Sequence, residues 1–174
     1  MKKILSFFAL AALVGAASAA SLKWDLKGSA FGTSDGSATR AYGYYVAVVS
    51  ESDLSAAIAA VGDESAFSAF VKDGGSATTS RTGAASGTIV VAEDSGTSLS
   101  YVLFAFDAST VGDASNYIVS AAQTGIAYEP PATPTAATFN AQSFSGSTWT
   151  AVPEPATAAL ALLGLGLMIK RRKA

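Results

Sequence analysis

The pattern of apolar and polar positions predicts β-strands early in the chain. Leu22, Trp24 and Leu26 alternate with charged residues, and this period of two is typical of a strand with one buried face. Tyr42–Val49 and Ser98–Phe106 consist mostly of apolar and aromatic residues. Such runs are typical of strands covered on both faces, so we expect both of them in the centre of a sheet.

Shorter runs predict the remaining strands. Thr88–Ala92 contains β-branched residues, and Asn116–Ala121 continues the series. A group of prolines between positions 130 and 134 then indicates an extended crossing. We expect Phe139, Phe144 and Trp149 to belong to a last strand or hairpin.

A first short helix is predicted directly after the second strand. Ser50 and Asp53 have the spacing of a capping box, with Asp in place of the usual Glu. Leu54, Ile58 and Val61 would then lie on one face of the helix and point inward.

A second helix is expected to begin after Asp63, which suits an N-cap, and to end at Gly74–Gly75. Phe67, Phe70 and Val71 would face inward. Because strands precede and follow this helical pair, the chain is predicted to be mainly β. We expect a small β-sandwich-like domain with an inserted helical hairpin.

The first 20 residues predict a secretory signal peptide with an apolar helix. Two lysines precede the apolar run Ile4–Val14, and small residues follow it. Ala17 and Ala19 fit the A-x-A pattern, which predicts cleavage by signal peptidase after Ala19. Cleavage after Ala20 is the alternative.

The C-terminal end has three parts. Pro153, Glu154 and Pro155 are followed by an uncharged run of fourteen residues, Ala156–Ile169. As a helix this run spans roughly 21 Å, against a bilayer core of about 30 Å, so it is a short transmembrane anchor. The residues of this run that we expect to form the membrane anchor are Ala156, Leu160, Leu162, Leu163, Leu165, Leu167 and Ile169. The basic end that should stay cytoplasmic is Lys170, Arg171, Arg172 and Lys173.

This tripartite tail resembles the PEP-CTERM sorting signal, with its Pro-Glu-Pro motif, apolar helix and basic end. The resemblance implies processing by an exosortase, a membrane enzyme of Gram-negative bacteria, and a link with exopolysaccharide or biofilm matrix. It also implies export across the inner membrane and a precursor held there transiently. The expected organisation is a signal peptide at 1–20, a β-rich extracytoplasmic domain at 21–151 and the sorting tail at 152–174.

Composition and charge exclude several function classes. The sequence has no cysteine and no histidine, which removes disulfides, thiolate zinc sites and the commonest general base. Residues 21–151 carry five basic and twelve acidic side chains, a net charge of −7. An acidic surface repels phosphate, so we expect no nucleic-acid partner. No metal or cofactor is predicted.

Two patterns resemble parts of catalytic sites but lack the groups that would complete them. Gly32–Gly36 matches G-x-S-x-G around Ser34, but that motif needs a histidine and a strand-to-helix turn. The adjacent carboxylate pairs Asp63/Glu64 and Glu93/Asp94 would point apart rather than face each other across a cleft. We therefore expect no enzyme, with a carboxylate-based hydrolase as the weakest alternative.

Two kinds of binding site are compatible with the sequence. Asp107, Asp113 and Asn116 share one loop and could supply oxygen ligands to calcium, although ordinary turn chemistry explains them more simply. Aromatic side chains could stack on sugars if exposed, and these are Tyr42, Tyr44, Tyr45, Tyr101, Tyr117 and Trp149. The leading hypothesis is a structural or adhesive surface or matrix protein. The alternative is a carbohydrate-binding module with matrix polysaccharide as its partner.

Overall fold

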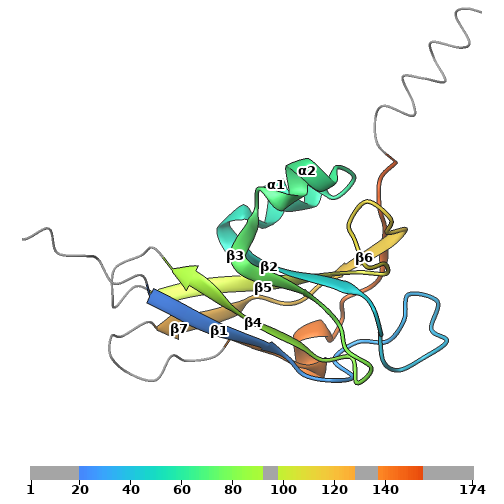
Figure 1. Ribbon diagram of the computed structural model, residues 1–174, viewed down its shortest axis with the longest axis horizontal. Coiled ribbons are helices and arrows are strands. Elements are labelled where there is room, and N and C mark those ends of the chain that lie inside the picture. The colour runs from blue at the N-terminus through green and yellow to red at the C-terminus, as the bar shows by residue number, and fades with distance from the viewer. Residues whose placement is uncertain (1–19, 92–97, 128–136, 155–174) are drawn as a thin grey trace, which may run out of the picture.

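The computed structural model describes residues 20–91, 98–127 and 137–154, and two β-sheets dominate it (Figure 1). The smaller, sheet A, has the strand order β4-β1-β8. Its central strand β1 (Ala20–Leu26) pairs antiparallel with β4 (Ala85–Val91) and parallel with β8 (Ala137–Phe139). The predicted first strand is therefore confirmed, as the centre of a sheet that non-consecutive segments complete.

The larger, sheet B, has six strands in the order β3-β2-β5-β6-β9, with β7 also pairing with β5. All of its pairings are antiparallel. The strands are β2 (Tyr45–Ser50), β3 (Val71–Thr78), β5 (Ser98–Phe106), β6 (Asn116–Val119), β7 (Gln123–Ala127) and β9 (Thr150–Ala151). The two predicted central strands are β2 and β5, which lie side by side, although β2 begins at Tyr45 and not at the predicted Tyr42.

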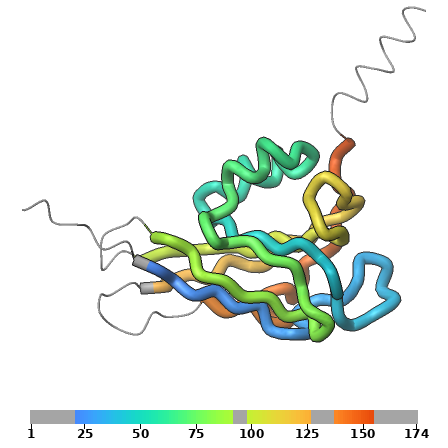
Figure 2. Tube along the Cα trace, in the orientation of Figure 1, coloured from blue at the N-terminus to red at the C-terminus, as the bar shows by residue number. Residues whose placement is uncertain are grey.

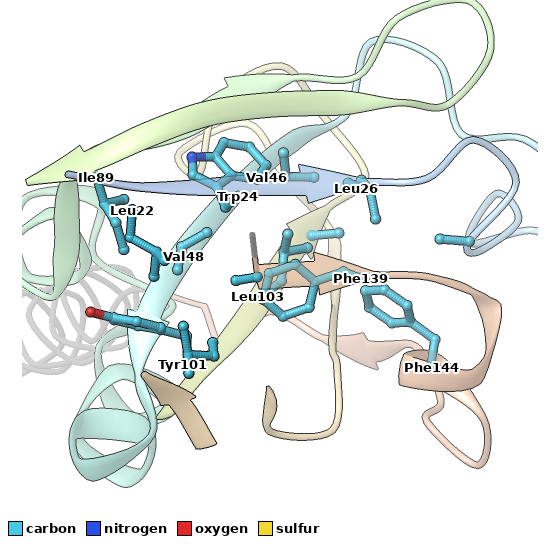
Figure 3. Close-up of a cluster of buried hydrophobic side chains, with 14 of the residues drawn as sticks. Leu22, Trp24, Leu26, Val46, Val48, Ile89, Tyr101, Leu103, Phe139 and Phe144 are labelled. Carbon is cyan, nitrogen blue, oxygen red and sulfur yellow. The ribbon is translucent and has the colours of Figure 1, made fainter. Parts of the chain in front are cut away.

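Sheet B is covered on both faces because its central strands are apolar on both faces. Val46 and Val48 of β2 point into a cluster shared with sheet A, and Figure 3 shows them beside Leu22, Trp24 and Leu103. Alternate residues of the same strands point the other way, toward the helices. The second cluster includes Ala47, Val49, Val102, Phe104 and Phe106. Figure 2 shows the resulting arrangement, with sheet B between sheet A and the helical segment.

The helical segment begins with a 3₁₀ turn, Glu51–Asp53, followed by α1 (Leu54–Ala60) and α2 (Glu64–Ser68). The predicted capping box at the first helix is wrong, because neither Ser50 nor Asp53 makes a side-chain capping bond. The predicted cap of the second helix is confirmed. The Asp63 carboxylate accepts a hydrogen bond of 3.0 Å from the Ala66 amide.

The buried face of the helices differs in part from the prediction. Val61 and Phe67 are buried, but Ile58 is 39% exposed and Ala57 is buried instead. The second helix also ends at Ser68, well before Gly74–Gly75, which lie inside β3. A run of Lys, Asp, Gly and Ser does not show the alternation of a strand, so the sequence does not predict β3.

The final described segment is more irregular than the predicted strand or hairpin. A 3₁₀ turn, Ala141–Phe144, follows β8 and brings Phe144 against Phe31, with ring centroids 4.9 Å apart. Trp149 packs edge-on against Phe31 and Tyr44. The two-residue strand β9 then joins the outer edge of sheet B beside β6.

The prediction of a mainly β chain with a few short helices is confirmed. The predicted signal helix and the tail helix lie outside the described residues. Within residues 20–91, 98–127 and 137–154, no helix is long and apolar enough to cross a membrane.

The two sheets approach each other closely at one edge, where a tryptophan bridges them. The Trp24 indole nitrogen in sheet A donates a hydrogen bond of 3.0 Å to the Gly74 carbonyl in β3. A Cβ on Gly74 would lie 2.0 Å from the Thr88 carbonyl oxygen, and Gly74 has a φ of +70°. A Cβ on Gly87 would lie 2.5 Å from the indole nitrogen. Only glycine at both positions permits this approach.

Replacing Gly87 with Ala should therefore lower the free energy of unfolding by about 1–3 kcal/mol, because the added methyl group pushes the indole away from its acceptor. Urea unfolding followed by tryptophan fluorescence measures this change. Ser86→Ala is the matched control on the exposed side of the same strand, and it should change stability by less than about 0.5 kcal/mol. Equal unfolding midpoints for Gly87→Ala and the wild type would contradict the proposed tight fit.

Candidate functional site

A cluster of hydrogen bonds lies where β5 ends, centred on the Asp107 carboxylate. One carboxylate oxygen accepts bonds of 2.8 Å from the backbone amides of both Ser115 and Asn116. The other accepts the Asn116 side-chain amide at 2.7 Å and the Ser34 hydroxyl at 3.0 Å. These four donors close the 107–116 loop and tie it to the distant Gly32–Gly36 turn.

Hydrogen bonds also lower the pKa of two carboxyl groups in this region, Asp107 and Asp35. Partial burial of Asp107 opposes ionisation, but the bonds from Asn116, Ser34 and Ser115 outweigh it and hold the pKa below its ordinary value of 3.8. In the neighbouring turn, the Thr33 hydroxyl and the Ser37 amide lower the pKa of Asp35 to about 2. Both groups are therefore carboxylates at neutral pH.

This geometry assigns Asp107 to loop structure and gives no support to a calcium site. Its oxygens already accept four hydrogen bonds, and Asp113 accepts one from the Thr110 hydroxyl at 2.8 Å. Among the residues that the structure describes, no group of three or more acidic, histidine or cysteine side chains could hold a metal ion. Ordinary turn chemistry, the simpler of the two explanations, accounts for the loop.

The Ser34 segment is a turn, as its glycines indicate. The Gly36 amide donates to the Thr33 carbonyl at 3.0 Å, and the segment joins two strands without leading into a helix. The Ser34 hydroxyl donates to Asp107. The structure therefore lacks the strand-to-helix elbow that a nucleophilic serine of this motif requires.

The candidate carboxylate pairs do not form a catalytic arrangement in the described part of the chain. Asp63 caps α2, and the Glu64 carboxylate lies next to Gly112. Asp25 pairs with the Lys27 ammonium group on the surface. The pair Glu93/Asp94 lies outside the described residues.

The six candidate sugar-stacking aromatics do not form an exposed row. Tyr101 and Tyr117 are buried, whereas Tyr44, Tyr45 and Trp149 are partly buried against the two hydrophobic clusters. Tyr42 alone among these six is exposed, at 63%. A flat aromatic platform for a polysaccharide therefore cannot be built from this set.

The chain enters the Pro-Glu-Pro segment directly from the fold. Thr150 and Ala151 pair with Tyr117 and Asn116 of β6, and the Val152 amide donates to the Ser115 carbonyl at 2.9 Å. Val152 is half-buried against the second hydrophobic cluster.

Beyond Val152 the chain reaches the surface, and Figure 1 shows this end running past β6. Pro153 and Glu154 are exposed. Beside them is a hollow of about 320 Å³ whose lining includes Gly62, Gly112 and Ser115. The first two residues of the motif are therefore exposed to solvent in the folded domain.

Comparison with known families decides what this segment is. Residues 151–173 match the PEP-CTERM protein-sorting motif. The resemblance seen in the tail is thus confirmed, and the PEP-CTERM match indicates an exported, membrane-anchored precursor that an exosortase processes. No curated protein and no solved structure matches the chain.

Sequence reasoning placed Val152 at the start of the tail but missed its docking on the domain beside Ser115 and Gly62. The Val152 amide donates a hydrogen bond to the Ser115 carbonyl, and the Gly62 backbone lies close to Pro153 at the start of the matched segment. A lone valine before Pro-Glu-Pro gives no signal of such docking, since the pairing depends on residues far away in sequence. The rest of the predicted tail, from Pro155 to the basic end, lies outside the described residues, as do Ala17 and Ala19. Those assignments stay predictions.

Replacing Asp107 with Asn should destabilise the domain by about 1–2 kcal/mol near neutral pH, because an amide nitrogen would then face the Asn116 and Ser34 donors. Since folding lowers the pKa of Asp107, the stabilising effect of its carboxylate is complete above the ordinary pKa of 3.8. The effect is lost as pH falls through the folded pKa.

The free energies of unfolding of the wild type and of Asp107→Asn should consequently become more similar below about pH 4. Urea unfolding at a series of pH values measures this. Asp113→Asn serves as the control, because Asp113 is exposed and its carboxylate contacts only its own loop. If the two free energies of unfolding differ by the same amount down to acid pH, ionisation of Asp107 contributes nothing to stability.

Proposed function

We propose that this chain is the precursor of a non-enzymatic surface or matrix protein that an exosortase releases or transfers at its PEP-CTERM tail. The observation that carries the proposal is the position of the motif. Pro153 and Glu154 stand exposed immediately after the last strand of a folded domain. The expected cut would leave that domain outside the inner membrane.

A structural or adhesive role is supported by how the polar side chains are used. The Asp107 and Asp63 carboxylates accept hydrogen bonds that hold a loop and a helix in place. The sequence supplies neither histidine nor cysteine, and the net charge of −7 over residues 21–151 suits a domain surrounded by hydrated polymer. We further propose that sheets A and B form a β-sandwich carrying the helical pair on one face.

The carbohydrate-binding alternative has weaker support. It requires exposed aromatic side chains in a row, and Tyr42 stands alone among the six candidates. The prediction that matrix polysaccharide is a partner is supported by the tail resemblance alone.

Replacing Glu154 with Ala should block processing, because Glu154 is the only acidic residue in the matched segment 151–173 and its side chain is exposed. The measurement is intact mass after fractionation of the native cells. The wild type should yield a form that starts near Ala20 or Ser21 and ends within residues 153–155, outside the inner membrane. Glu154→Ala should keep its basic end and stay in that membrane.

Glu51→Ala is the matched control, since Glu51 is also an exposed glutamate but lies far from the tail in sequence. It should be processed like the wild type. If the wild-type protein itself keeps residues 170–174 in the inner membrane, the proposed sorting is wrong and the chain is a simply anchored domain.

A further inference from the structure

We propose that the folded domain itself positions the sorting motif, with Val152 and Gly62 as positioning residues, so that the exosortase meets Pro153 and Glu154 at the end of a docked strand. This inference rests on the proposed function and adds that the domain takes part in presenting its own tail. The alternative is a motif that is recognised as a free peptide.

The first observation is that docking continues to the residue before the motif. β9 is paired with β6 through Thr150 and Ala151, and the Val152 amide bonds to the Ser115 carbonyl at 2.9 Å. The Val152 side chain packs against the second hydrophobic cluster. Ser115 is held in turn by the Asp107 carboxylate, at 2.8 Å from its amide. β9 and Val152 are therefore bonded to a loop that the Asp107 carboxylate itself holds in place.

The second observation is a close approach of two backbones at the motif itself. A Cβ on Gly62, in the turn between α1 and α2, would lie 2.6 Å from the Pro153 carbonyl oxygen and 3.5 Å from its carbon. No side chain fits between the turn and the tail at that point. Gly62 thus allows the helical segment to contact the first motif residue directly.

The third point is the short distance that remains to the apolar run. Only Glu154 and Pro155 separate Pro153 from Ala156, and a chain advances at most about 3.6 Å per residue. The motif is therefore held within roughly 11 Å of the start of the predicted anchor, whatever path the chain takes. An enzyme acting at this place must accept the α1–α2 turn and the 111–115 loop beside the motif.

Docking should speed processing because it removes conformational freedom before the enzyme binds. An undocked tail would have to be ordered over several residues at the moment of binding, and each ordered residue costs free energy. Undocking of the tail from the domain should therefore slow its processing by the exosortase by about tenfold, equivalent to about 1.4 kcal/mol.

Gly62→Ala tests this without changing the motif, since its methyl group would push the Pro153 backbone off the domain. Gly112→Ala is the matched control from the same hollow. Its Cβ would meet only the flexible end of the Glu64 side chain, at 2.7 Å. In a pulse-chase experiment with the full chain in native cells, Gly62→Ala should be processed about tenfold more slowly and Gly112→Ala at the wild-type rate.

A second variant separates presentation from folding. Inserting Gly-Ser-Gly between Val152 and Pro153 leaves β9 and Val152 docked but frees the motif, and it should also slow processing. This variant decides the question if Gly62→Ala proves protease-sensitive and hence misfolded. Wild-type or faster processing of the insertion variant would overturn the positioning role. Failure of the sorting proposal looks different, because the wild type and Gly112→Ala would then also stay uncut.

Discussion

The burial of sheet B on both faces is the constraint on which the rest of the structure depends. β2 and β5 alternate between two hydrophobic clusters, one shared with sheet A and one shared with the helical segment. Because the apolar residues along these strands belong alternately to one cluster or the other, a shift of register by one position would exchange the two sets of side chains. The pairing of β2 with β5 therefore fixes where sheet A, the helices and the outer strands can lie.

The polar network at the end of β5 transmits that order to the outer edge of sheet B. Asp107 follows Phe106, a fully buried residue, so its carboxylate has a defined place. It holds the Ser115 and Asn116 amides, and Ser115 in turn accepts the Val152 amide. A continuous series of contacts thus leads from the core to the PEP-CTERM segment. The Ser34 turn joins the same network from another part of the chain.

The sequence predicts those features of the fold that arise from neighbouring residues, and it misses those that depend on contacts between distant residues. The β5 strand is predicted with its observed bounds, because nine mostly apolar residues need no partner to be recognised. The Asp63 cap and the Pro-Glu-Pro motif are likewise local signals. By contrast, β3 is missed because its Gly74–Gly75 pair resembles a helix end. In the structure the Gly74 carbonyl accepts a hydrogen bond from the Trp24 indole where the two sheets come close together. This role depends on a residue fifty positions away. The docking of Val152 is missed for the same reason.

The position of β9 also bears on what remains after a cut at the motif. The contacts that hold this strand come from β6, the Ser115 carbonyl and the second hydrophobic cluster, all within the domain. Their partners on the tail side are Thr150, Ala151 and Val152, which precede Pro153. A cut within or after the motif keeps every one of these contacts in the released domain. The same strand can therefore present the motif in the precursor and close the edge of sheet B in the product, so processing need not reduce stability.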